Sequence, residues 1–115
     1  LLTQEEEHGL LKYMFPTVEE KMLENVSNIT SLTRAEALTE NPRISSGVST
    51  RTSVEIAGLL FDGFSLLESA DITIYPQYDS TGGVDSERTF VKQIVQKFIS
   101  DGSEEELFNE HDSDV

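Results

Sequence analysis

Three segments of the chain carry the same helix-start signal, a hydroxyl residue followed three positions later by glutamate. They are Thr3-Gln4-Glu5-Glu6, Thr17-Val18-Glu19-Glu20 and Ser65-Leu66-Leu67-Glu68. In such a capping box, the hydroxyl and the carboxylate satisfy backbone amides that the first helical turn leaves free. Three of these starts within 115 residues predict one all-α domain, a compact bundle of about five helices.

Apolar spacing and helix breakers set the expected bounds of these helices. The five helices are expected over about residues 4–14, 18–38, 50–61, 66–75 and 86–100. The first and fourth are expected to end at Pro16 and Pro76, because proline disfavours helix in the residue before it. Gly63 suits the left-handed position just beyond the third helix, and Asp101-Gly102 is expected to stop the fifth.

Residues that recur at helical spacing define the expected core. Those expected to face inward are Leu10, Leu11, Met14, Val18, Met22, Val26, Ile29, Val54, Ala57, Phe61, Leu67, Ala70, Ile74, Phe90, Val91, Ile94, Val95 and Phe98. Leu23 is expected beside the inward residues of the second helix, and Ile56, Leu59 and Leu60 fill the neighbouring face of the third. The third helix is apolar over most of its circumference, so it is expected to be central and buried. Gly58 on this helix has no side chain and is expected to let another helix approach closely.

The net charge of −14, from 22 acidic and 8 basic residues, restricts the partners. Such a surface repels nucleic acid and anionic lipid, so neither is expected to bind.

The chain has no cysteine, no apolar run near the roughly 18 residues that span a bilayer, and no visible signal peptide. These features favour a cytoplasmic protein. Residues 103–115 are predicted to form a disordered acidic tail, which leaves a helical domain at 1–102.

Few residues offer catalytic chemistry. His8 lies among glutamates and His111 lies in the acidic tail, and neither has a serine or an acid at the spacing of a triad. Residues 79–87 resemble a calcium loop only faintly, because the twelfth position is Phe90 and not glutamate. We therefore expect no metal site and no enzyme activity from this chain alone.

The segment Gly47-Val48-Ser49-Thr50-Arg51 is the strongest candidate for function. Glycine frees the backbone, Ser49 can cap the following helix, and Arg51 falls in its first turn. A guanidinium in that position is held by rigid structure and can point outward to bind a phosphate or a carboxylate. The alternative is that Arg51 forms a local salt bridge with a nearby acid. Arg43 is a second candidate, or a plain loop residue.

The same segment, followed by a buried helix, resembles the start of the sensor 2 helix in AAA+ ATPases of the MoxR branch. It is especially similar to the CbbQ, NorQ and gas-vesicle GvpN type, in which a Gly-x-Ser-Thr/Pro-Arg motif opens a helix of the lid domain. Residues 59–65 look like the turn between two lid helices, and residues 70–79 resemble the helix that follows. Residues 3–38 are similar to the helix pair that leads from the ATPase core into the lid.

The resemblance implies that the chain is the C-terminal lid of a longer ATPase, which the absence of an initiator methionine also favours. Arg51 would reach the γ-phosphate of ATP, with Thr50 and Ser49 beside it. The ATP and its Mg²⁺ would be bound mainly by a core domain upstream of Leu1, which would hold the Walker motifs. The implied partners are that core, neighbouring subunits of a homo-hexameric ring, and a protein client that ATP hydrolysis remodels.

A stand-alone acidic helical module that binds a protein partner is the alternative. It predicts an exposed apolar groove and a local salt bridge at Arg51.

Overall fold

The computed structural model describes residues 2–99, and all regular structure within this range is helical. The five helices are α1 (Gln4–Met14), α2 (Glu20–Ala37), α3 (Thr50–Phe61), α4 (Leu66–Thr73) and α5 (Glu87–Ile99). Two short 3₁₀ turns, η1 (Tyr75–Gln77) and η2 (Gly83–Asp85), connect α4 to α5. The predicted all-α bundle of five helices is confirmed for the described residues.

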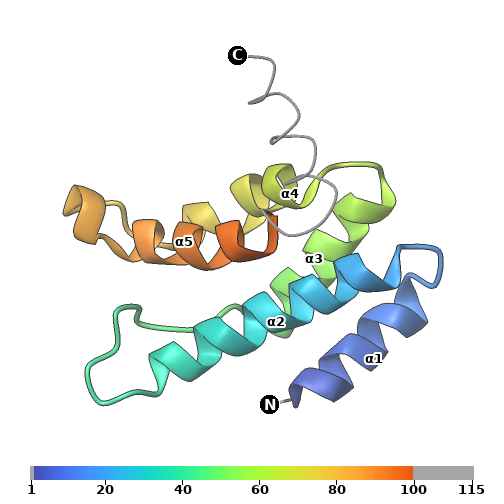
Figure 1. The fold of residues 1–115 in the computed structure, drawn as a ribbon, viewed down its shortest axis with the longest axis horizontal. Helices are drawn as coiled ribbons and strands as arrows, with labels where there is room; N and C mark the ends of the chain where they lie inside the picture. The colour runs from blue at the N-terminus through green and yellow to red at the C-terminus, as the bar shows by residue number, and fades with distance from the viewer. Residues whose placement is uncertain (1, 100–115) are drawn as a thin grey trace, which may run out of the picture.

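The five helices pack against one another around a single hydrophobic core (Figure 1). α1 and α2 lie side by side as an antiparallel pair, and α5 packs along another side of α2. α3 contacts α1, α2 and α4, as expected of a central helix, but it is not buried on all sides, because Arg51, Glu55 and Phe61 are exposed. No helix in the described part of the chain is both long enough and apolar enough to cross a membrane.

Two of the three predicted capping boxes form. Thr3 caps α1 and Ser65 caps α4, and in each case the glutamate three positions later binds the capping residue's amide. The prediction at Thr17 is wrong, because α2 begins at Glu20 and its N-cap, Glu19, makes no side-chain capping bond. The amide of Val18 instead donates to the carbonyl of Phe15 in a turn. Burial of the Val18 side chain stabilises that turn in place of a first helical turn.

The helix ends follow the glycine signal and the first of the two proline signals, since α1 ends at Met14, just before Phe15-Pro16. Gly63 has a φ of +100°, and the amides of Gly63 and Phe64 donate to Leu60 and Leu59, which is the Schellman arrangement expected there. α4 ends at Thr73 rather than Tyr75, because the chain tightens into the 3₁₀ turn that contains Pro76. The expected stop at residues 101–102 and the expected tail at 103–115 lie outside the described residues.

The core contains most of the residues expected from helical spacing. Those expected and buried are Leu11, Val18, Val26, Ile29, Ala57, Ala70, Ile74, Val91, Ile94 and Val95. Leu23, Ile56 and Leu60, which were expected beside these residues on apolar helix faces, are buried as well. Residues that spacing did not place in the core also enter it; they are Ile44, Val48, Leu66, Tyr75 and Tyr78. Four of these, at positions 44, 48, 75 and 78, lie outside the five α-helices, where helical periodicity carries no information.

Three residues expected in the core are exposed: Met14 at 45%, Phe61 at 58% and Leu67 at 41%. Each lies at a helix end, where a shift of one position moves a side chain off the inner face. In α4 the cap at Ser65 directs Leu66 inward, with Ser69 and Ala70 on the same face. The Phe61 ring instead lies 6.0 Å from the Phe15 ring, centroid to centroid.

The expectation for Gly58 is also wrong. The group nearest to its missing side chain is the ring of Phe15, and a Cβ there would meet Phe15 Cζ at an ordinary contact distance of 3.7 Å. No helix among residues 2–99 approaches α3 at this point closely enough to require glycine.

Candidate functional site at the start of helix α3

Arg51 is the second residue of α3 and is exposed to solvent. The helix is capped by Ser49, whose Oγ accepts a hydrogen bond from the Thr52 amide at 3.1 Å. The first turn of α3 contains no acidic residue. Within the described part of the chain, no hydrogen bond or ion pair joins Arg51 to another side chain, although Glu55 follows one turn later. The local salt bridge that the alternative predicts is absent from residues 2–99.

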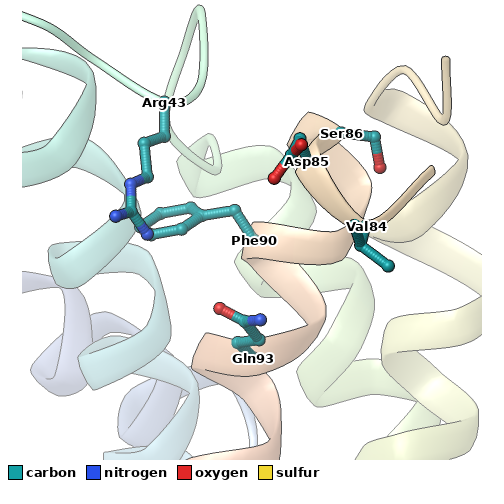
Figure 2. A pocket seen from close by; sticks show the side chains of 6 residues that line it. All are labelled: Arg43, Val84, Asp85, Ser86, Phe90 and Gln93. Atoms are coloured by element: carbon teal, nitrogen blue, oxygen red, sulfur yellow. The ribbon is translucent and has the colours of Figure 1, made fainter. Parts of the chain in front are cut away.

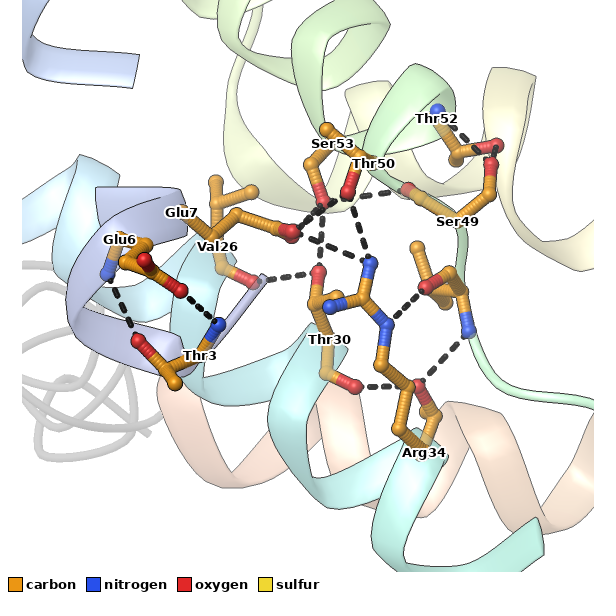
Figure 3. Close-up of polar contacts among 12 residues, drawn as sticks. Thr3, Glu6, Glu7, Val26, Thr30, Arg34, Ser49, Thr50, Thr52 and Ser53 are labelled. Carbon is orange, nitrogen blue, oxygen red and sulfur yellow. Dashed lines mark hydrogen bonds and ion pairs between the residues drawn. The ribbon is translucent and has the colours of Figure 1, made fainter. Parts of the chain in front are cut away.

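Thr50 and Ser53, which lie on either side of Arg51 in the chain, bind a buried carboxylate (Figure 3). Glu7 of α1 is 1% exposed, and both of its oxygens have partners. Oε1 accepts from Thr50 Oγ1 at 2.8 Å and lies 3.0 Å from Arg34 Nη2. Oε2 accepts from Ser53 Oγ at 2.7 Å, and Ser53 Oγ lies 2.7 Å from Thr30 Oγ1. A buried charge is tolerated when it is paired and hydrogen-bonded, and Glu7 meets both conditions.

Arg34 of α2 extends this polar junction to the segment before α3. Its Nε donates to the carbonyl of Val48 at 2.9 Å, while Nη2 donates to Thr50 Oγ1 at 3.1 Å. The amide of Val48 donates to Thr33 Oγ1, also at 2.9 Å. Both backbone groups of Val48 are therefore bound by neighbouring side chains of α2. We call the set Glu7, Arg34, Thr50 and Ser53 the buried junction, because it surrounds the buried carboxylate; Arg34 and Thr50 are themselves partly exposed.

Gly47 allows the backbone to approach α2 this closely. A Cβ at this position would lie 2.5 Å from Arg34 Cγ and 2.6 Å from Arg34 Cα. The second of these atoms belongs to the helix backbone and cannot rotate away. The glycine of the sequence motif is thus required by a close approach of two backbone segments.

The segment before α3 is also hydrogen-bonded to Tyr78 and to the start of α5. Tyr78 Oη donates to the carbonyl of Ser46 at 2.9 Å. Glu87 Oε1 at the start of α5 accepts from the amide of Ser45 at 2.7 Å and from its hydroxyl at 3.1 Å. Burial, with a smaller contribution from the charge of Glu87, raises the pKa of Tyr78 to about 12.

Arg43 lies elsewhere and has a different role. Its guanidinium stacks over the Phe90 ring at 5.2 Å from the centroid, at the edge of a pocket of about 310 Å³ (Figure 2). An apolar groove of about 400 Å³ continues from there between α2 and α5. Its lining includes Leu32, Ala35, Phe90, Ile94 and Lys97. Arg43 is therefore part of an aromatic contact and lines the groove.

The structure thus separates the three residues that the motif groups together. Arg51 is exposed, whereas the hydroxyls of Thr50 and Ser49 both form hydrogen bonds within the domain.

Glu7 and Arg34 were not predicted from the sequence, since Glu7 looked like one of three solvated acids at a helix start. The available signal was its spacing, because Glu7 lies four residues before the buried Leu11 and on the same face of α1. Among residues 2–99, no group of three or more histidine and acidic side chains is arranged to hold a metal.

Comparison with protein-family models gives no match, and searches of curated proteins and of solved structures find no similar chain.

Gly47→Ala is expected to lower the free energy of unfolding by about 1–3 kcal/mol, because the new methyl group overlaps the backbone of Arg34. Gly58→Ala is the matched control; its Cβ meets only ordinary contacts, and alanine favours helix by up to about 1 kcal/mol. Urea unfolding of both variants measures the difference. Equal stability of the two variants would contradict the close approach at Gly47.

Stability is expected to fall as the pH rises from 10 to about 12. Burial raises the pKa of Tyr75 and of Tyr78 from 10.0 to about 12, with smaller contributions from Asp71 and Glu87 respectively. The folded state then holds these protons more tightly than the unfolded state, so the stabilisation is complete below pH 10 and is lost above it.

Unfolding curves collected at several pH values test this dependence. Tyr78→Phe should reduce the loss of stability between pH 10 and 12, whereas Tyr13→Phe should not, because Tyr13 is 85% exposed. The same pH slope in all three proteins would show that the buried phenols do not cause it.

Proposed function

We propose that residues 2–99 form the helical lid of an AAA+ ATPase of the MoxR branch, with Arg51 contacting the γ-phosphate of ATP bound by a core domain. The position of Arg51 carries this proposal. It is exposed in the first turn of α3 and has no partner in the described part of the chain. The residues on both sides of it are anchored, since Thr50 and Ser53 bind Glu7.

This arrangement suits a sensor of phosphate. A guanidinium offers a planar fork of donors that binds phosphate oxygens in pairs and stays charged at every physiological pH. The N-terminal end of α3 adds the positive end of the helix dipole on the same side. Because neighbouring residues hold the backbone at Arg51, only the freedom of its side chain is lost when the guanidinium meets the phosphate.

One arginine is not a complete nucleotide site. The chain as a whole carries a net charge of −14, which opposes binding of a triphosphate, and the sequence contains no phosphate-binding loop. Arg51 would therefore act on ATP that another domain binds together with Mg²⁺. Hydrolysis removes the γ-phosphate from Arg51 and lets the lid rotate. In a homo-hexameric ring in the cytoplasm, that rotation would remodel a protein client.

A second candidate function is suggested by the groove between α2 and α5. It has an apolar floor that includes Leu32 and Ile94, and Arg43 and Lys97 lie beside it. A stand-alone acidic module that binds a protein partner would use such a groove, and its activity would not depend on nucleotide. The absence of a local salt bridge at Arg51 within residues 2–99 favours the lid over this alternative.

ATP hydrolysis by the full-length protein tests the proposal. Arg51→Ala should lower kcat about 100-fold, the usual effect of removing one donor from a charged transition state. Its free energy of unfolding should change by less than about 0.5 kcal/mol, because Arg51 is exposed and unpaired within residues 2–99. Arg43→Ala is the matched control, since it removes the same charge from another exposed site, and should retain turnover.

Two results would contradict the proposal. The first is a full-length protein with no nucleotide dependence. The second is an Arg51→Ala variant that hydrolyses ATP as fast as the wild type or no more slowly than Arg43→Ala. Either result would make the partner-binding module the better account.

A further inference from the structure

We infer that Thr50 is a positioning residue for Arg51, and that it acts through Glu7 and Arg34 rather than by touching the nucleotide. This inference rests on the proposed function of Arg51. It concerns how the start of α3 is held, and it assigns to the buried junction the task of directing the arginine.

The hydroxyl of Thr50 has no proton left to give to a phosphate. A hydroxyl carries one donor, and Thr50 Oγ1 donates it to Glu7 Oε1 at 2.8 Å. The same oxygen accepts from Arg34 Nη2 at 3.1 Å. Phosphate oxygens at the γ position only accept, so a direct contact would require breaking the bond to a buried carboxylate. The motif's threonine is therefore used inside the domain.

Two bonds to one carboxylate fix how α3 is turned about its own axis. Thr50 binds Glu7 Oε1, and Ser53, one helical turn later, binds Glu7 Oε2. Residues three apart lie on the same face of a helix, so this face of α3 is turned towards α1. Arg51 follows Thr50 by roughly 100° around the helix and is directed away from the carboxylate. Rotation of the first turn would break both bonds in a buried, low-dielectric site.

The junction also joins three helices into one body at this point. Glu7 lies on α1, Arg34 lies on α2, and their side chains lie 3.0 Å apart while both bind Thr50. A pull on Arg51 from a phosphate would thus move α1, α2 and α3 together, because bending only the start of α3 would expose a buried ion pair. Thr50 is the member of the junction that lies next to the arginine in the chain.

Steady-state ATP hydrolysis by the full-length protein tests the inference with four variants: Thr50→Val, Thr50→Ser, Arg51→Ala and Thr50→Val combined with Arg51→Ala. Valine keeps the shape of threonine and removes the hydroxyl, whereas serine keeps the hydroxyl. Thr50→Val should lower kcat by about 10- to 100-fold, the cost of a misdirected catalytic group. Thr50→Ser should retain most of the wild-type kcat, because it keeps the hydroxyl.

The combined variant separates positioning from a general structural effect. If Thr50 acts only through Arg51, Thr50→Val should cause no further loss of kcat once Arg51 is alanine. A purely structural role would lower turnover by the same factor in both backgrounds. Equal factors would therefore overturn the inference, as would a Thr50→Ser variant no better than Thr50→Val.

The remaining outcomes distinguish this inference from the proposed function. Full turnover in Thr50→Val together with a large loss in Arg51→Ala would overturn the positioning role and leave the phosphate sensor intact. Full turnover in Arg51→Ala would remove the proposed function itself. If Thr50→Val does not fold, as judged by circular dichroism, Ser53→Ala with and without Arg51→Ala gives the same comparison, because Ser53 binds the other oxygen of Glu7.

Discussion

The buried carboxylate of Glu7 is the interaction on which the rest of this structure depends. It is 1% exposed and takes donors from two helices, Arg34 on α2 and Thr50 and Ser53 on α3. Breaking a buried ion pair by removing one partner costs about 3–5 kcal/mol, because the other charge stays buried without compensation. That amount is a large part of the stability of a domain of this size. Each of the three helices is therefore fixed relative to the other two.

The geometry of the functional segment follows from this junction. To reach the carbonyl of Val48, Arg34 requires the backbone before α3 to lie directly against α2, and only glycine fits at position 47. Tyr78 and Glu87 secure the same segment from the side of α5. The start of α3 is thus held from several directions, while Arg51 is left exposed. This contrast between a fixed backbone and a free guanidinium is the physical basis of the proposed phosphate sensor.

Local rules predicted much of the fold and little of the site. The capping boxes at Thr3 and Ser65 and the glycine at position 63 depend on residues within one turn, so the sequence reveals them directly. Thr17 carried the same local signal and failed, because burial of Val18 after Pro16 favours a turn. Glu7 binds partners 43 and 46 residues away, and no local pattern marks such a pairing. The exposure of Arg51 was predictable, whereas the internal use of the Thr50 hydroxyl was not.

Native-state hydrogen exchange at the amide of Val48 tests most directly whether the buried junction holds the start of α3. This amide donates to Thr33 Oγ1, and Val48 itself is 1% exposed. It should therefore exchange as slowly as the core amide of Val91. Glu7→Gln removes the partner charge of Arg34 and should accelerate exchange at Val48 more than at Val91. Rapid exchange at Val48 in the wild type, or equal acceleration at both amides in the variant, would contradict the account.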